Sequence, residues 1–189
     1  MSRHRAGRRL AGALLVALCT AGVAGCYGWN VPSVRVTYTY EVVSRGVVYT
    51  PLEEFAAHAA STYADSRGWR RDGIAFQRVP SGGHFTLVLA SPAEVPRFSS
   101  ACSSFYSCRV GRYVIINDDR WRMASPTWPI GLHEYRQMVV NHETGHWLGL
   151  GHWSCPGPAA LAPVMVQQSI GLQGCHANPW PTDAELRAV

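Results

Sequence analysis

Alternating apolar and polar positions along the chain predict several strands. Residues 34–43 (VRVTYTYEVV) are rich in β-branched and aromatic side chains, which favours a strand. Residues 74–79 and 84–90 predict two further strands, and the Pro-Ser-Gly-Gly sequence between them predicts that they form a hairpin. Residues 112–117 (RYVIIN) have the composition of a buried strand.

Two other segments have the periodicity of helices. Residues 52–66 follow Thr50-Pro51-Leu52-Glu53, which has the pattern of a capping box with proline at the first helical position. Residues 132–148 predict a long helix that begins after a proline. The sequence from Thr182 to Glu185 predicts a second capping box, which would open a short terminal helix.

The order of these elements indicates the fold class. A strand, a helix, three strands and a long helix predict a sheet with two main helices packed against it, of the α+β or α/β class. Residues 91–111 and 149–181 are rich in Pro, Ser and Gly and predict irregular segments. No change of composition marks a boundary within 34–189, so we expect these residues to form a single domain.

The positive charge is concentrated at the N-terminus. The chain has 189 residues and a formal net charge of +5, and all 17 basic side chains are arginines. Without residues 1–25, 13 arginines remain against 12 acidic side chains, a net charge of +1. We therefore expect no nucleic-acid partner, because a basic surface would be needed for one.

The N-terminal residues have the features of an export signal. Four arginines precede an apolar run from Leu10 to Gly25, which predicts a secretory signal over residues 1–25. Val23-Ala24-Gly25-Cys26 resembles a bacterial lipobox, so Cys26 is a candidate for lipidation and residues 26–33 for a short tether. Simple secretion and an uncleaved anchor helix are the alternatives. Each predicts an exported protein, held at the cytoplasmic membrane by a lipid or anchor, or secreted.

The remaining cysteines agree with export. Outside the signal and Cys26 there are four, and an even number in an exported chain favours two disulfides. Four cysteines allow three pairings, of which the simplest is the local one, Cys102–Cys108 and Cys155–Cys175. A cysteine-based metal site is the alternative, but no CxxC spacing is present.

Residues 142–152 (HETGHWLGLGH) carry the strongest chemical signal. His142 and His146 are four residues apart on the predicted helix, so both imidazoles lie on one face and can bind one metal ion. Gly149 can end the helix in a left-handed conformation and return His152 to the same ion. Three histidines leave the fourth position of a zinc ion open, and Glu143 can take a proton from water bound there.

These residues resemble a known clan. HExxHxxGxxH is the zinc-binding consensus of the metzincin metallopeptidases, and residues 142–152 match every fixed position. The resemblance implies a zincin-like fold: a twisted mixed sheet, an active-site helix and an irregular C-terminal part with a methionine-containing turn. Pro163-Val164-Met165-Val166 is similar to that turn, in which Met165 would pack beneath the imidazoles without binding the metal.

The stretch from Asn141 to Pro181 is also similar to a group of exported actinobacterial proteins that resemble metzincins and are catalogued as a domain of unknown function. One difference from better-known metzincins concerns a tyrosine that often follows the turn methionine. Here Val166-Gln167-Gln168 follow instead, so Gln167, Gln168 or His176 are the candidates to replace it.

The sequence therefore predicts a monomeric zinc metalloendopeptidase with one catalytic Zn²⁺ and a peptide or protein substrate. Two alternatives remain. The first is a catalytically silent zinc-binding surface lipoprotein with a binding or envelope role. The second is a zinc hydrolase acting on a non-peptide bond. Four tryptophans are close to the motif in sequence: Trp121, Trp128, Trp153 and Trp180. They are candidates to line the cleft, and packing in the core or on the surface is the alternative.

Overall fold

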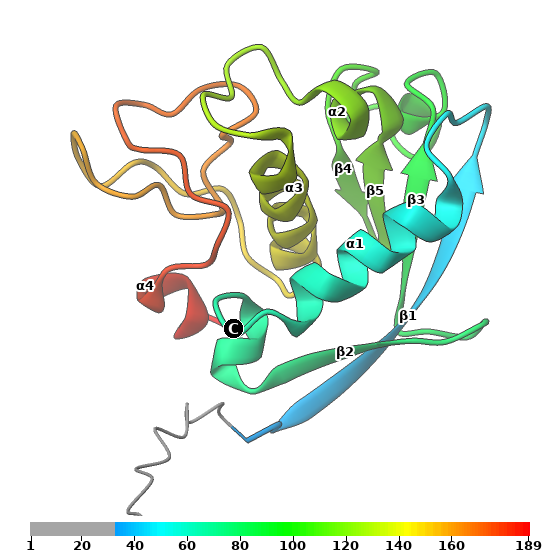
Figure 1. Ribbon diagram of the computed structural model, residues 1–189, viewed down its shortest axis with the longest axis horizontal. Helices are drawn as coiled ribbons and strands as arrows, with labels where there is room; N and C mark the ends of the chain where they lie inside the picture. Colours follow the sequence, from blue (N-terminus) through cyan, green and yellow to red (C-terminus); the bar gives the residue numbers. More distant parts are fainter. Residues whose placement is uncertain (1–32) are drawn as a thin grey trace, which may run out of the picture. The chain divides into compact units, whose positions relative to one another are not determined.

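The computed structural model describes residues 33–189, which form a five-stranded sheet with helices (Figure 1). The predicted signal, residues 1–25, and the tether with Cys26 that follows lie outside the described residues. The elements are, in chain order, β1 (Val36–Arg45), α1 (Leu52–Ala64), the 3₁₀-helix η1 (Trp69–Asp72), β2 (Ile74–Arg78), β3 (Phe85–Ala90), the 3₁₀-helix η2 (Val95–Arg97), β4 (Cys108–Val110), β5 (Tyr113–Asn117), α2 (Asp118–Met123), α3 (Leu132–Trp147) and α4 (Asp183–Leu186).

The sheet is mixed, in the order β2-β1-β3-β5-β4. Strands β2, β1, β3 and β5 run parallel to one another. β4 pairs antiparallel with β5 at one edge of the sheet. Helices α1 and α3 cover one face of the sheet (Figure 1). The structure therefore has the α+β architecture with a mixed sheet and two main helices that the sequence predicts.

Alternation along β3 explains why two cores form. Phe85, Leu87 and Leu89 are fully buried against the helices in the main core. Val88 and Ala90 point to the opposite face, where they pack in a smaller core that includes η2. Both faces of β3 are covered, which is why its residues are apolar except for Thr86.

The predicted hairpin of residues 74–79 and 84–90 is wrong. β2 pairs in parallel with one side of β1, and β3 pairs in parallel with its other side. The connection crosses beside Tyr40, where a Cβ atom on Gly83 would come within 2.8 Å of the Tyr40 Cα. The Gly-Gly pair marks a bend in the chain, but it does not determine which strand each neighbour pairs with.

The predicted capping box at Thr50 is also absent. Pro51 is the N-cap of α1 and no side chain caps the helix, while the Thr50 hydroxyl has no partner. Glu53 instead accepts two hydrogen bonds from the Arg78 guanidinium of β2, at 2.6 and 2.8 Å. Paired charge-assisted bonds outcompete a single bond to a backbone N–H. The capping box of Thr182 and Glu185 is present at α4.

Two elements lie outside the segments predicted to be strands or helices. β4 is only three residues long, too short to produce a visible pattern. α2 begins where the Asn117 side chain accepts hydrogen bonds from the amides of Asp119 and Arg120. Within residues 33–189, no helix has the length and apolar character needed to cross a membrane.

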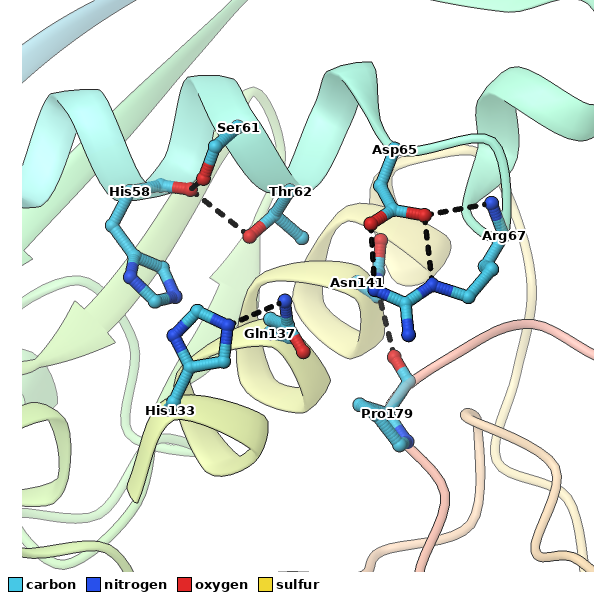
Figure 2. A network of polar contacts seen from close by, with 9 residues as sticks. All are labelled: His58, Ser61, Thr62, Asp65, Arg67, His133, Gln137, Asn141 and Pro179. Carbon is cyan, nitrogen blue, oxygen red and sulfur yellow. Dashed lines mark hydrogen bonds and ion pairs between the residues drawn. The ribbon is translucent and has the colours of Figure 1, made fainter. Parts of the chain in front are cut away.

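Helices α1 and α3 pack against each other, and a group of polar side chains lies along their contact (Figure 2). The rings of His58 on α1 and His133 on α3 are 5.0 Å apart, and His133 shares a 3.0 Å hydrogen bond with Gln137. Farther along α3, the Asn141 side-chain amide donates to the Pro179 carbonyl at 2.9 Å. These contacts position α3 against both α1 and the C-terminal segment.

Candidate metal centre

Three histidines bring their ring nitrogens to one point. His142 and His146 lie on α3, and their Nε2 atoms are 3.1 Å apart. The Nε2 atom of His152 is 3.1 Å from that of His146. Among residues 33–189, these side chains are the one group of three or more with donor atoms close enough to share a metal ion.

A sharp turn after α3 returns His152 to the centre. Gly149 has a φ of +106°, in the region that only glycine adopts at low cost. The Leu150 amide then donates to the Gly145 carbonyl at 3.0 Å. The Leu150 carbonyl accepts a 2.8 Å hydrogen bond from the Nδ1 of His146. The turn therefore positions one ligand and orients another.

The protonation of the rings suits a cation. The Nδ1 of His142 donates to the Val164 carbonyl at 2.7 Å, as that of His146 does to Leu150. Both Nε2 atoms therefore present lone pairs to each other, an arrangement that a cation between them stabilises. Burial lowers the pKa of His142 to about 3, which keeps this ring neutral. Tetrahedral zinc spaces ligand nitrogens about 3.4 Å apart, so the site fits one zinc ion.

Glu143 lies next to these ligands with its carboxyl group directed into the same cleft. Its side chain is 5% exposed, and burial raises its pKa to about 8, opposed by the positive charge of Arg109. A bound dication would lower this pKa, because it favours the ionised carboxylate. The group is therefore placed to exchange a proton with water in the cleft.

Met165 lies beneath the ligand helix and is fully buried. Its sulfur rests against Gly145, where a Cβ atom would overlap it. The Met165 carbonyl accepts a 3.0 Å hydrogen bond from the Trp153 amide, directly after His152. The methionine turn is thus attached both to the ligand helix and to the segment of the third histidine.

A buried carboxylate anchors this turn. Glu185, of the α4 capping box, accepts hydrogen bonds from the amides of Val164 at 3.1 Å and Met165 at 2.7 Å. It also accepts from the Thr182 amide and hydroxyl, at 2.7 and 2.8 Å. Because the Val164 carbonyl orients His142, the anchor acts on a candidate ligand.

The structure contains the two local disulfides. Cys155 is bonded to Cys175, which ties the segment after His152 to the chain beyond the methionine turn. Cys102 is bonded to Cys108, at the start of β4. Disulfides persist in oxidising compartments, so the pair indicates an extracytoplasmic protein.

The three histidines and Glu143 open onto a cleft of about 440 Å³. One wall consists of the loop closed by the Cys102–Cys108 disulfide, which includes Tyr106, and of Arg109 on β4. The other wall is the segment from Gln167 to Ile170. Met138 and Val139 of α3 form its apolar part.

Of the candidates to replace the missing tyrosine, Gln167 and Gln168 line this cleft and His176 does not. Gln168 is fully buried, and its amide bonds the Asn178 backbone at 2.7 and 2.9 Å, so it serves the loop structure. None of the four tryptophans lines the cleft: Trp121, Trp128 and Trp180 are buried, and Trp153 packs against the main core.

Sequence reasoning missed four residues of this region, namely Tyr106, Arg109, Gly145 and Glu185. A glycine inside a predicted helix indicates close packing, so the sequence alone could have identified Gly145 as a contact site. Tyr106 and Arg109 stand in a segment without periodicity, and the link from Glu185 to Met165 spans 20 residues. Nothing local in the sequence indicates these three.

The domain is of the α+β class, and its helix and turn bring three histidines together beside a buried glutamate and above a buried methionine. These features define a metzincin-like zinc site. The chain belongs to a family described as "Protein of unknown function (DUF3152)", which it matches over residues 30–184. The crystal structure of an archaemetzincin from Methanopyrus kandleri is similar over 80% of this chain and 93% of that chain, with 15% sequence identity and a TM-score of 0.46. No curated protein sequence matches the chain.

Proposed function

We propose that the protein is a zinc metallopeptidase that hydrolyses peptide bonds outside the cytoplasm. The observation that supports this most directly is the convergence of three histidine Nε2 atoms beside the buried carboxyl group of Glu143. His142, His146 and His152 would hold the ion. Zinc bound there supplies Lewis acidity, which lowers the pKa of water and polarises a carbonyl group.

Glu143 carries the proton transfers in this proposal. Its carboxylate takes a proton from the attacking water and then gives it to the amine that leaves when the peptide bond breaks. The carboxyl group faces the cleft and forms no hydrogen bond with another side chain of residues 33–189, so it is free to act on water and substrate.

The position of β4 supports an extended substrate. β4 is one of the two edge strands of the sheet, and its residues Cys108 and Arg109 line the cleft. A peptide can add to such an edge by main-chain hydrogen bonds, which would place its backbone beside the metal. Lipid attachment at Cys26 is part of the same proposal and would hold the enzyme at the membrane surface.

The decisive experiment combines metal analysis with a cleavage screen. The purified protein is expected to bind about one zinc ion per chain and to cleave members of a peptide library, detected by mass spectrometry. The Glu143→Gln variant should retain zinc and lose cleavage by a factor of about 100 or more. Cleavage that persists in this variant would contradict the mechanism. Zinc binding without any cleavage would instead support the silent surface protein.

A further inference from the structure

Among the residues that the structure describes, Arg109 is the one cationic side chain that lines the cleft outside the histidine site. Its position follows from strand register. Arg109 lies opposite Val114 in the antiparallel pair of β4 and β5, so the two side chains project from the same face of the sheet. Val114 is fully buried in the main core, against α3. Arg109 is therefore on the side of the metal-binding helix.

The two neighbours of Arg109 on β4 confirm this direction. Cys108 and Val110 pack against the smaller core on the opposite face of the sheet. Of the three side chains of the strand, that of Arg109 alone projects from the face of the sheet that α3 covers. Its charge is close enough to lower the pKa of both Glu143 and His146, although burial has a larger effect on each.

Arg109 also lacks a polar partner among residues 33–189. Eight other arginines of residues 33–189 form ion pairs with carboxylates of the chain. Arg109 forms no ion pair and no side-chain hydrogen bond within the same residues. Its five N–H donors therefore remain available to a ligand in the cleft.

The other residues of the cleft leave it positively charged when zinc is bound. Among the described residues that line the cleft, Glu143 is the one acidic side chain, and the others are neutral apart from Arg109 and the three histidines. A zinc dication and the Arg109 guanidinium together exceed this single negative charge. Such a cleft attracts an anionic group and disfavours a cationic one.

We propose that Arg109 determines specificity by binding a carboxylate of the peptide, beside the bond that is cut. This inference rests on the proposed peptidase function. The carboxylate belongs to an Asp or Glu side chain or to the C-terminus of a short peptide, because a guanidinium binds all of these in the same bidentate way. The substrate class is therefore acidic peptides.

Matched peptide pairs test the proposal. Peptides cleaved by the zinc-loaded protein are resynthesised with Glu against Gln, or Asp against Asn, at each position flanking the cut bond. A further pair has a free or an amidated C-terminus, which separates the two sources of the carboxylate. We expect kcat/KM to be about 10- to 100-fold higher for one acidic form, as for a hydrogen-bonded ion pair.

The Arg109→Gln variant should reduce that preference to about threefold or less, mainly through KM for the acidic peptide. Arg45→Gln is the control, because it removes the same charge from the exposed end of β1, outside the cleft. A wild-type preference for the neutral peptides would overturn the proposal. So would an equal loss of kcat/KM for both peptides in Arg109→Gln, which would indicate a different role.

A binding measurement separates this inference from the peptidase proposal. Zinc-loaded Glu143→Gln protein is titrated with fluorescent acidic and neutral versions of one peptide, followed by anisotropy. Tighter binding of the acidic version, by about tenfold or more and dependent on Arg109, supports the inference even if no peptide is cut. Equal binding of the two versions contradicts it, whatever the cleavage screen shows.

Discussion

The sulfur of Met165 rests directly on Gly145, in the turn of α3 that separates His142 from His146. A Cβ atom at position 145 would overlap this sulfur and would lie 3.0 Å from the Trp69 ring. The contact explains why a glycine stands in the middle of a 16-residue helix, where it costs about 1 kcal/mol relative to alanine. Close approach of the methionine turn outweighs that cost.

Replacing Gly145 by Ala should therefore destabilise the protein, although alanine has a higher helix propensity than glycine. We expect a net loss of about 1–2 kcal/mol and a fall in Tm of about 3–6 °C, measured by thermal denaturation. Gly171→Ala is the control, because no atom lies within 4 Å of a Cβ there. Combining Gly145→Ala with Met165→Ala should cost less than the sum of the two single changes; strict additivity would argue against the contact.

Loss of the Glu185 anchor should affect both stability and metal binding. Glu185→Gln retains the shape but turns an N–H donor toward the amides of the methionine turn. We expect a loss of about 3 kcal/mol and zinc affinity about tenfold weaker, measured by denaturation and by competition with a chelating dye. Asp183 is exposed in the same helix, so Asp183→Asn should change both the stability and the zinc affinity by much less.

The two disulfides should have different effects. Removing Cys155–Cys175 by paired serine substitution should cost about 3 kcal/mol and weaken zinc binding, whereas the shorter loop of Cys102–Cys108 should cost about 2 kcal/mol. The second change should leave zinc binding intact and alter peptide KM, because its loop forms a cleft wall. Equal effects of both changes on zinc affinity would contradict this division.

Zinc should stabilise the folded protein measurably. At a free zinc concentration 100 times the Kd, the free energy of unfolding should rise by about 2.7 kcal/mol. This corresponds to a rise in Tm of about 5–10 °C. A chelator should reverse it. His146→Ala should abolish the shift, whereas His84→Ala should preserve it, because His84 lies on the sheet and bonds Thr39.

Acid should weaken the packing of α1 on α3 through His58. Burial, with the charges of His133 and Arg136, lowers the pKa of His58 to about 4. Its ring contacts that of Trp121. It also contacts the ring of His133, which Figure 2 shows. The folded state thus binds fewer protons than the unfolded state between pH 6.5 and 4, so stability falls as pH decreases through this range.

His58→Gln should make the zinc-free protein lose less Tm than the wild type between pH 7 and 4.5. The same measurement on His84→Gln is the control, since that side chain is exposed and bonds Thr39 of β1. Parallel curves for the wild type and His58→Gln would show that His58 does not contribute. Because both proteins carry the same three histidines at the centre, their titration cancels in the comparison.

Local patterns were sufficient for the centre itself. The spacing of His142 and His146 is set by one helical turn, and Gly149 indicates the return of His152. Long-range pairing was not predictable. The sequence of the two strands joined by the Gly-Gly turn is also compatible with a hairpin. In the structure each strand pairs with β1 instead, and this pairing leaves no local pattern in the sequence. Likewise, Arg109 acquires its place from pairing with β5.

The anchor at Glu185 makes the metal centre depend on the short C-terminal helix. The carbonyl that orients His142 belongs to a turn held by the Glu185 carboxylate. A chain shortened before residue 185 would keep the three histidines but lose the framework that directs one of them. We expect such a chain to bind zinc more weakly, so metal loading would report that α4 has docked.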